Sequence, residues 1–338
     1  MKFEFDDDHY AQRDAIGRYL ADNAGAAELR RYWDKDARDT ALWGGLAGLG
    51  VLSLTVPEAH GGEGGGLCDA ALLIEELGRY AVPHPVAEAL GVVVPVLQRC
   101  GDEPMRSEWL PGIARGNVMA SIQDGWDGRA AWGAEAQLVL VVHDDGVSLC
   151  RPSPKTQRIA DPADPARRPA RLVRADEFAR IEGPAPVRMM RDCARTVLAQ
   201  FLLGLSSATI ARAVDYAKQR EQFGRPIGSF QAVKHMLANA HVAVETARRA
   251  TWHAAWCIDH DHAEAGEAAA IAKGGAAEAA VEASYAGLQV HGAIGYTWEC
   301  DLHFWLKRIH ALEGQFGGAR ALWRELADMT FDESGAVT

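Results

Sequence analysis

The segment REQFGRPIGSFQAVKH, residues 220–235, lies between two stretches that are rich in helix-forming residues. Arg220 closes the first stretch, and Gly224 and Pro226 favour a turn, because proline fixes its φ angle and glycine accepts conformations that other residues avoid. Ser229 is the expected N-cap of the next helix, since its hydroxyl can accept a hydrogen bond from a backbone amide. The segment therefore predicts that two antiparallel helices meet at this turn.

The residue types in this turn also suit a ligand. The guanidinium of Arg220 could bind phosphate oxygens in a bidentate manner, and the ring of Phe223 could cover an adenine base. A pyrophosphate beside a stackable base is one interpretation of the segment. A turn with a purely structural role is the other, and the segment taken alone leaves both open.

On either side of the turn, the sequence divides into three regions that differ in their pattern of hydrophobic and turn-forming residues. Helical periodicity fills the first third, as in GLCDAALLIEELGRYA from Gly66, and it returns in four long blocks near the C-terminus, which predicts a helical bundle. Between them, runs such as AQLVLVVHDDGVSLC are broken by Gly, Pro and Asp, as in hairpin-linked strands. The predicted bundle helices are roughly 189–220, 230–260, 264–289 and 299–331.

These residue patterns predict a mainly α fold with one small β domain. Strands do not alternate with helices, which argues against a Rossmann arrangement. The predicted domains are an N-terminal helical domain (1–116), a middle β domain (117–187), a C-terminal helical bundle (188–332) and a tail (333–338). The glycine-rich GGEGGG at 61–66 follows VLSLTV, a possible strand, but it matches no phosphate-loop spacing, and a plain loop before a helix is the favoured interpretation.

Composition excludes several classes of function. The 338 residues carry a net charge of −11, which argues against nucleic acid or anionic lipid as the main partner. We found no apolar run of the roughly 18 residues that span a bilayer and no signal sequence, so a cytoplasmic protein is expected. The six cysteines are widely spaced, and the DHDH at 259–262 is interpreted as a solvated loop, so no metal site is predicted.

A second glycine-containing loop joins two predicted bundle helices. It lies in GLQVHGAIGYTWECDLHFWLKR, residues 287–308, and is flanked by Gln289 and the aromatic pair Tyr296 and Trp298. Closely spaced glycines let a ligand approach the backbone, although a tight turn between helices would use them as well.

Together, REQFGRPIGSFQ and QVHGAIGYTWE resemble the two signature segments of the flavin-dependent acyl-CoA dehydrogenase family, and VPEAHGGEGGGLCDAALLIEELGRYA resembles part of its N-terminal helical domain. The resemblance implies a helical domain, a middle β-barrel-like domain and a four-helix bundle. It also implies FAD as cofactor, an acyl-CoA substrate and an electron-transfer flavoprotein as acceptor. The implied assembly is a homo-oligomer (dimer or tetramer) or a hetero-oligomer with a homologous subunit.

The resemblance assigns roles to individual residues. Arg220 and Phe223 match positions on the pyrophosphate and adenine side of FAD, and Gln231 matches another flavin-side contact. Asp192 and Arg195, in RDCAR, match acyl-CoA contacts, although an ordinary helix-start acid and an exposed arginine are the alternative interpretation. The loop that reaches the FAD of a neighbouring subunit corresponds to Gln289, Val290, His291, Gly292 and Ala293, where Ala293 replaces the usual second glycine.

The family's catalytic base is the least secure assignment. Removing a weakly acidic α proton from a thioester requires a carboxylate in a poorly solvated pocket. Glu313-Gly314 resembles the family's base motif, but an ungapped count from Gly295 places the base near Phe316, so Glu313 matches only with a short deletion. Some relatives place the base beside the position of Arg195, where this chain has Ala194. Glu313 is therefore the candidate base, and an exposed residue near a helix end is the alternative.

The middle domain departs further from the family pattern. Relatives carry a Thr-Glu-Pro segment over the flavin ring, whereas this chain has MASIQDGWDGRAAWG at 119–133. The compact length resembles subunits of heteromeric bacterial acyl-CoA dehydrogenases. The resemblance thus implies an acyl-CoA dehydrogenase of acyl-CoA catabolism, or one subunit of it. The alternatives are a non-catalytic subunit that completes the flavin site of a homologous chain, and the same fold used for another flavin reaction.

Overall fold

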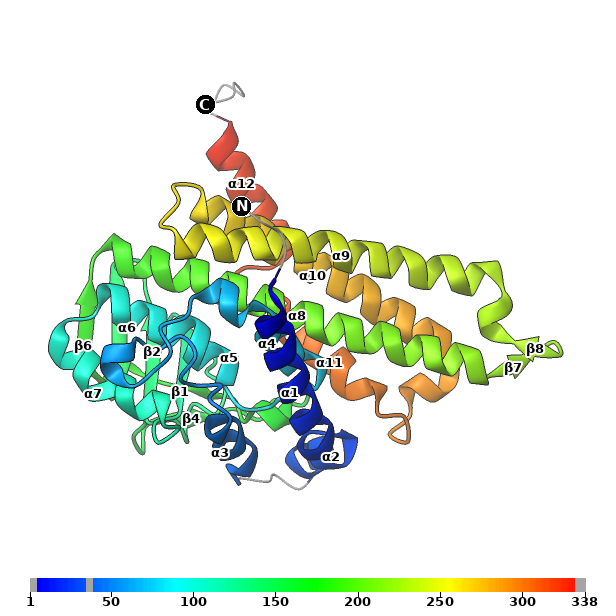
Figure 1. Ribbon diagram of the computed structural model, residues 1–338, viewed down its shortest axis with the longest axis horizontal. Coiled ribbons are helices and arrows are strands. Elements are labelled where there is room, and N and C mark those ends of the chain that lie inside the picture. The colour runs from blue at the N-terminus through cyan, green and yellow to red at the C-terminus, as the bar shows by residue number, and fades with distance from the viewer. Residues whose placement is uncertain (1–4, 35–38, 332–338) are drawn as a thin grey trace.

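The computed structural model describes residues 5–34 and 39–331 and contains a helical N-terminal region, a small sheet region and a long C-terminal bundle (Figure 1). The predicted mainly α fold is confirmed. The N-terminal helices are α1 (Asp7–Asn23), α2 (Ala26–Asp34), α3 (Ala41–Gly48), α4 (Leu67–Arg79), α5 (Val86–Glu88), α6 (Val94–Cys100) and α7 (Glu103–Ala114). The C-terminal helices are α8 (Pro184–Gln219), α9 (Gln231–Asp259), α10 (Ala265–His291), α11 (Leu302–Leu312) and α12 (Ala319–Thr330).

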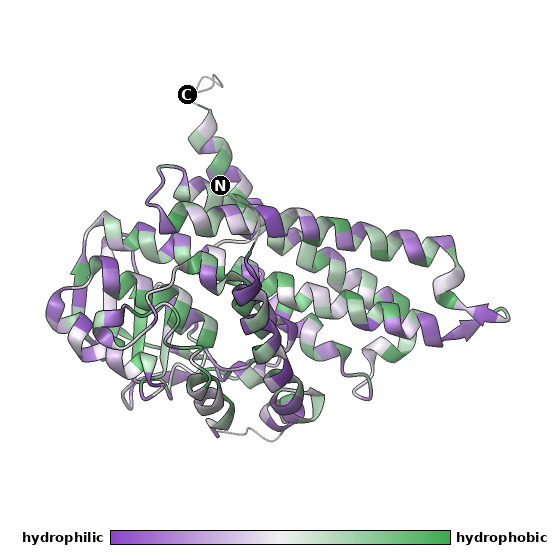
Figure 2. Ribbon diagram, viewed as in Figure 1, coloured by the Kyte–Doolittle hydropathy of each residue, from purple (hydrophilic) through white to green (hydrophobic). Residues whose placement is uncertain are grey.

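The middle region is built on a four-stranded sheet in the order β1-β2-β3-β6. Strands β2 and β3 form the expected antiparallel hairpin, but β1 pairs with β2 in parallel, so the connection across 125–137 is not a hairpin. All five residues of β2, LVLVV, are buried, and the sheet is strongly hydrophobic in Figure 2. The strands are β1 (Ala120–Asp124), β2 (Leu138–Val142), β3 (Gly146–Cys150), β4 (Gln157–Arg158), β5 (Ala170–Arg171) and β6 (Glu177–Glu182).

Helix α8 crosses α4 at very short range through two glycines. A Cβ atom on Gly204 would lie 1.9 Å from the backbone oxygen of Glu75, and one on Gly78 would lie 2.2 Å from that of Phe201. Neither position can therefore carry a side chain unless the helices separate. Among the described residues, α8 alone has the length and apolar composition to cross a membrane, but 78% of its apolar window is buried in the protein, as in a core helix.

Three local predictions are corrected by the structure. The block 299–331 contains two helices, because the chain leaves α11 at Leu312 and re-enters a helix at Ala319, with positive φ angles at Phe316 (55°) and Gly317 (107°). Ser229 does not cap α9; the cap residue is Phe230, without a side-chain hydrogen bond. VLSLTV at 51–56 forms turns rather than a strand.

The glycine-rich loop at 61–66 packs against protein and leads into α4, as expected for a plain loop. A Cβ on Gly62 would lie 2.0 Å from the backbone oxygen of Val56. The amides of Leu67 and Cys68, at the N-terminus of α4, both donate to the carboxylate of Asp259 at 2.8 Å. Asp259 therefore takes the position that an anion would need at this helix end, and no cluster of metal-binding side chains occurs within the described ranges.

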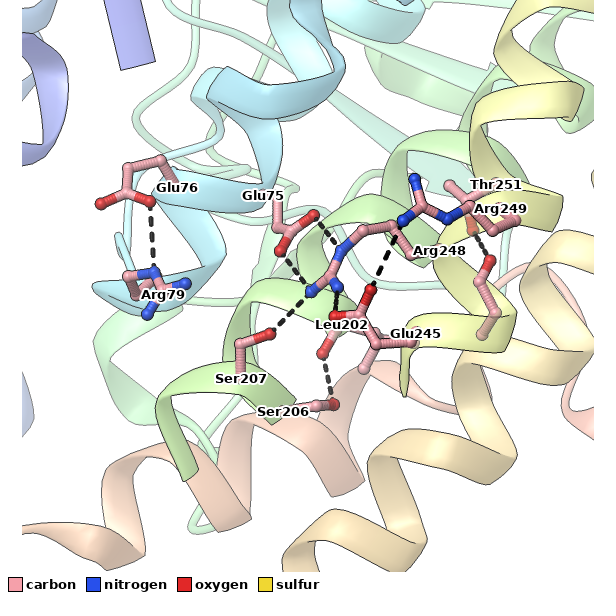
Figure 3. Close-up of polar contacts among 11 residues, drawn as sticks. Glu75, Glu76, Arg79, Leu202, Ser206, Ser207, Glu245, Arg248, Arg249 and Thr251 are labelled. Carbon is pink, nitrogen blue, oxygen red and sulfur yellow. Dashed lines mark hydrogen bonds and ion pairs between the residues drawn. The ribbon is translucent and has the colours of Figure 1, made fainter. Parts of the chain in front are cut away.

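A buried arginine ties three helices together. Arg248 of α9 donates from Nε and Nη2 to the two carboxylate oxygens of Glu75 in α4, at 3.0 and 2.8 Å. It also donates to Ser207 of α8 at 3.0 Å and pairs with Glu245 of its own helix (Figure 3). Bidentate pairing with satisfied donors is the geometry in which a buried ion pair is most favourable.

Replacing Arg248 with Ala is expected to lower the free energy of unfolding by about 3 kcal/mol or more, because Glu75 would remain buried without its counter-charge. The double variant Glu75→Leu/Arg248→Met should lose less than the sum of its single variants, and urea denaturation of the four proteins would measure this coupling. Additive losses would contradict the assignment of Arg248 and Glu75 as one unit.

Candidate functional site

The segment 220–235 forms a β-hairpin at the far end of the bundle (Figure 1). Helix α8 ends at Gln219, and β7 (Glu221–Gln222) pairs with β8 (Arg225–Pro226) around a two-residue loop. Both loop residues have positive φ angles, 55° at Phe223 and 75° at Gly224, as tight hairpin loops require. Phe223 is 93% exposed.

The structure brings the two signature segments together. A pocket of about 330 Å³ is lined by Gln222 and Phe223 of the hairpin and by Gln289 and Val290 at the end of α10. His291 stacks on Tyr216 of α8 with ring centroids 4.5 Å apart, and its Nδ1 lies 2.8 Å from the backbone oxygen of Gly287. Burial lowers the pKa of His291 below its ordinary value, so its ring is neutral at pH 7.

The remaining residues of the predicted cofactor set do not line this pocket but lie on the surface of the protein. Arg220 is the exposed cap residue of α8, and Gln231 is the exposed first residue of α9. Gly292 ends α10 with a φ angle of 63°, and Ala293 follows it, exposed, in the 3₁₀ turn η6 (Gly292–Tyr296). Their location at one end of the bundle is established, whereas their contacts with FAD stay a prediction.

A groove of about 820 Å³ extends from this end along α10. Gln289 and Tyr296 line it near the hairpin, and Glu313 and Ala319 line it at the other end. Its walls also present Glu278 and Glu282. The groove therefore connects the nucleotide-side loops with the candidate base along the surface of the bundle.

Glu313 is the last residue before the chain turns from α11 toward α12, and it is partly buried. Besides the groove, it lines a cavity of about 540 Å³ between this turn and the middle region, where Asp124, Arg129 and Pro169 form part of the opposite wall. The cavity has the location expected of a substrate or flavin site between the β domain and the bundle, and Glu313 is in contact with it.

The two predicted acyl-CoA contacts lie one turn apart on α8. Arg195 of α8 makes a bidentate ion pair with Glu325 of α12, at 2.8 and 2.7 Å, and its Nε donates to the backbone oxygen of Phe316 at 3.2 Å. Asp192 faces the start of α10, where a Cβ on Gly266 would lie 3.7 Å from its carboxylate. Burial raises the pKa of Asp192 to about 6. Contact of either residue with acyl-CoA stays a prediction.

Two features of the site were missed by the sequence analysis. Lys273 of α10 is fully buried and donates from Nζ to the backbone oxygens of Glu313 and Gly317, at 2.6 and 3.3 Å. Arg308 of α11 is 1% exposed and pairs with Asp164 at the edge of the 540 Å³ cavity. The only signal for Lys273 in the sequence is a single charge in the alanine-rich stretch AAAIAKGGAA.

The structure places a small sheet between two helical regions and brings the two glycine-containing loops to one end of the bundle, as the resemblance to flavin-dependent acyl-CoA dehydrogenases implies. The family descriptions "Acyl-CoA dehydrogenase, N-terminal domain" and "Acyl-CoA dehydrogenase, C-terminal domain" match residues 6–117 and 188–327. The chain therefore belongs to the acyl-CoA dehydrogenase family. Acyl-CoA dehydrogenase IpdE2 of Mycobacterium tuberculosis is 33% identical to it over 316 residues, which cover 93% of this chain and 94% of the relative.

Solved structures agree with this assignment. A structure described as a Tcur3481-Tcur3483 steroid ACAD G363A variant is 29% identical, with a TM-score of 0.83 over 95% of this chain and 97% of the other. The ChsE4-ChsE5 complex from M. tuberculosis shares the fold, with a TM-score of 0.84 and 23% identity over 96% and 98% of the two chains. Family membership supports flavin-dependent oxidation of an acyl-CoA by the enzyme to which this chain belongs.

Because Asp192 is partly buried, we expect the free energy of unfolding to depend on its protonation. Because its pKa is about 6 in the folded protein, above the ordinary value of 3.8, the folded state binds the proton more tightly than the unfolded state. Protonation of Asp192 therefore stabilises the folded state at low pH, and this contribution to the free energy of unfolding is lost as the pH rises from about 4 to 6. Asp192→Asn should raise the free energy of unfolding at pH 7.5 by about 1–2 kcal/mol.

Thermal denaturation of the wild type and Asp192→Asn at pH 4 and 7.5 would measure this difference, which should be small at pH 4. A loss of stability at pH 7.5 would show that the carboxylate has a stabilising partner. Titration of the same variant with acyl-CoA would test the second role predicted for Asp192, since a substrate contact should be weakened while the stability rises.

Proposed function

We propose that this chain is one subunit of an FAD-dependent acyl-CoA dehydrogenase that oxidises an acyl-CoA to the 2,3-enoyl-CoA and transfers electrons to an electron-transfer flavoprotein. The observation that carries the proposal is the separation of two half-sites within one chain. Lys273, which holds the turn of Glu313, and Gln289, which lines the nucleotide-side pocket, are 16 residues apart on α10, or about 24 Å. A single FAD with its ring beside Glu313 would have to extend over this distance to bring its adenine to Phe223 of the same chain.

The nucleotide-side half-site fits the adenine end of FAD. Its pocket of about 330 Å³ is lined mainly by apolar side chains, and Phe223 offers an exposed ring for stacking. Arg220, at the end of α8 next to the hairpin, is an exposed cation suited to a pyrophosphate. Because all of these groups face outward at the tip of the bundle, we infer that they serve an FAD whose ring is held by another subunit.

The second half-site supplies the acid–base chemistry. When bound, FAD supplies the acceptor for the hydride that leaves the β carbon of the substrate. The carboxylate of Glu313 would take the α proton, and the electron pair of that C–H bond forms the C2=C3 double bond as the hydride departs. Glu313 lies at the wall of a 540 Å³ cavity that has room for a thioester between the turn and the middle region.

A second candidate function is favoured by the surroundings of Arg195. This residue matches an acyl-CoA contact of the family, yet its guanidinium is engaged with Glu325 and with the backbone oxygen of Phe316. A subunit whose own acyl-CoA site is closed in this way could serve only to complete the flavin site of a homologous chain. In that case the partner would provide the base.

The two functions predict the same colours but different effects of a substitution at Glu313 on the rate of bleaching. The chain purified alone should be pale, and co-expression with a homologous subunit should give a yellow complex that an acyl-CoA bleaches anaerobically. Glu313→Gln should then slow bleaching by at least about a thousandfold, because no other group is proposed to accept the α proton. If the bleaching rate is unchanged, this chain is the non-catalytic subunit. Reoxidation by electron-transfer flavoprotein, compared with reoxidation by oxygen, would test the acceptor.

Phe223→Ala tests the nucleotide-side half-site separately. The variant should release FAD from the complex more readily, by about 1–3 kcal/mol in binding free energy, because a base loses its stacking partner. Since Phe223 is 93% exposed in the single chain, the substitution should not lower the stability of the isolated subunit. Undiminished FAD affinity would contradict the assignment of the hairpin to the nucleotide.

A further inference from the structure

The turn between α11 and α12, residues 313–318, is held through its backbone carbonyl groups by two cations from other helices. Lys273 of α10 donates to the oxygens of Glu313 and Gly317, at 2.6 and 3.3 Å. Arg195 of α8 donates to the oxygen of Phe316 at 3.2 Å. Three of the six carbonyl groups of this turn therefore accept hydrogen bonds from side chains that lie 40 or more residues away in sequence.

Burying the charged groups of Lys273 and Arg195 is unfavourable in free energy unless their donors find acceptors, and the contacts with the turn provide these acceptors. Lys273 is 0% exposed, and burial lowers its pKa to about 8, so the amine is still mainly charged at neutral pH. The side chain of Arg195 is 11% exposed and is fixed on its other edge by Glu325 of α12.

The turn has little local structure to hold it in place. Three of its six residues are glycines (Gly314, Gly317 and Gly318), and ordering such a backbone costs about 1–2 kcal/mol per residue. Phe316 has a φ angle of 55°, which is uncommon for a side chain of this size. Within the described residues, Gln315 donates only to the end of α11, at the oxygens of Leu312 and Ala311. The turn is therefore tied to the rest of the bundle by the buried ring of Phe316 and the two cations.

We propose that Lys273 is a positioning residue that fixes Glu313 for proton abstraction, with Arg195 and Glu325 as a second support of the same turn. This inference rests on the proposed role of Glu313 as the base. A hydrogen bond to the backbone oxygen of Glu313 fixes its Cα while leaving its carboxylate available to the cavity. A displacement of about 1 Å at a reacting group can lower a rate by about a hundredfold, so such an anchor would control the reaction without touching the substrate.

A buried lysine with only a structural role would behave differently. Its loss would lower the stability of the whole fold and leave the rate per folded active site unchanged. Lys273→Met removes all three donors and roughly keeps the volume, so it separates the two roles. Arg248→Met is the matched control, because it also removes a buried cation from a bundle helix but contacts no atom of the turn.

The first measurement is hydrogen exchange of the backbone amides, followed by mass spectrometry of peptides covering 309–320 and 240–255. Lys273→Met should raise exchange in 309–320 only, and Arg248→Met should raise it in 240–255. If the backbone amides of 309–320 exchange at the same rate in the wild type and in Lys273→Met, Lys273 does not anchor the turn and the proposal is wrong. If Lys273→Met does not fold, Glu325→Gln replaces it, with Arg324→Gln, an exposed position on the same helix, as control.

The second measurement is the rate of flavin bleaching by an acyl-CoA in the complete complex. Lys273→Met should lower this rate by about tenfold or more while the KM for acyl-CoA stays within about threefold, and Arg248→Met should change neither. If Lys273→Met bleaches at the wild-type rate while Glu313→Gln is slow, the positioning role is wrong and the proposed base stands. If neither variant is slow, the proposed base is wrong, and the positioning role with it.

Discussion

The close crossing of α4 and α8 is the constraint on which the rest of the structure depends. Gly78 and Gly204 allow the two backbones to approach to a distance that no side chain would permit. Glu75 takes part twice, because its backbone oxygen lies against Gly204 while its carboxylate binds Arg248 of α9. The N-terminal region is thereby joined to two bundle helices at one point, and the direction of α8 is fixed relative to both.

The length of α8 sets the distance between the Glu313 turn and the hairpin end of the bundle within one chain. Its 36 residues extend over about 54 Å, with Arg195 against the Glu313 turn in the N-terminal half and Tyr216 against His291 near the C-terminus. The Glu313 turn and the hairpin end of the bundle are therefore held apart by a rigid element rather than by a loop that could close. Under the proposed function, this separation requires a second subunit, and the exposed ring of Phe223 would contact the nucleotide.

The sequence was most informative about features that depend on residues close together in the chain, such as turns and helix ends. The turn between α8 and α9 was predicted from Gly224 and Pro226, whereas its β-hairpin form and the approach of the two signature loops within one chain were not predicted. The break after Leu312 was missed because EGQFGG lies in an otherwise helical pattern and Phe316 adopts a positive φ angle that its residue type does not indicate. Ser229 was misassigned because the chain makes a 3₁₀ turn there, so that the helix starts two residues later, at Gln231.

Pairings between distant residues could not be predicted from one sequence. Arg195 and Glu325 are 130 positions apart, and Lys273 meets Glu313 across the bundle. What such pairs share is that the cation binds a backbone carbonyl group of the turn, so these contacts do not depend on the side chain of Glu313. Phe316, which is buried, and Gly317, which has a φ angle of 107°, are constrained by packing and backbone conformation instead. The helix α12 is part of this support, because the carboxylate of Glu325 orients the guanidinium that binds Phe316, and displacement of α12 would therefore be transmitted to Glu313 through two hydrogen-bonded contacts.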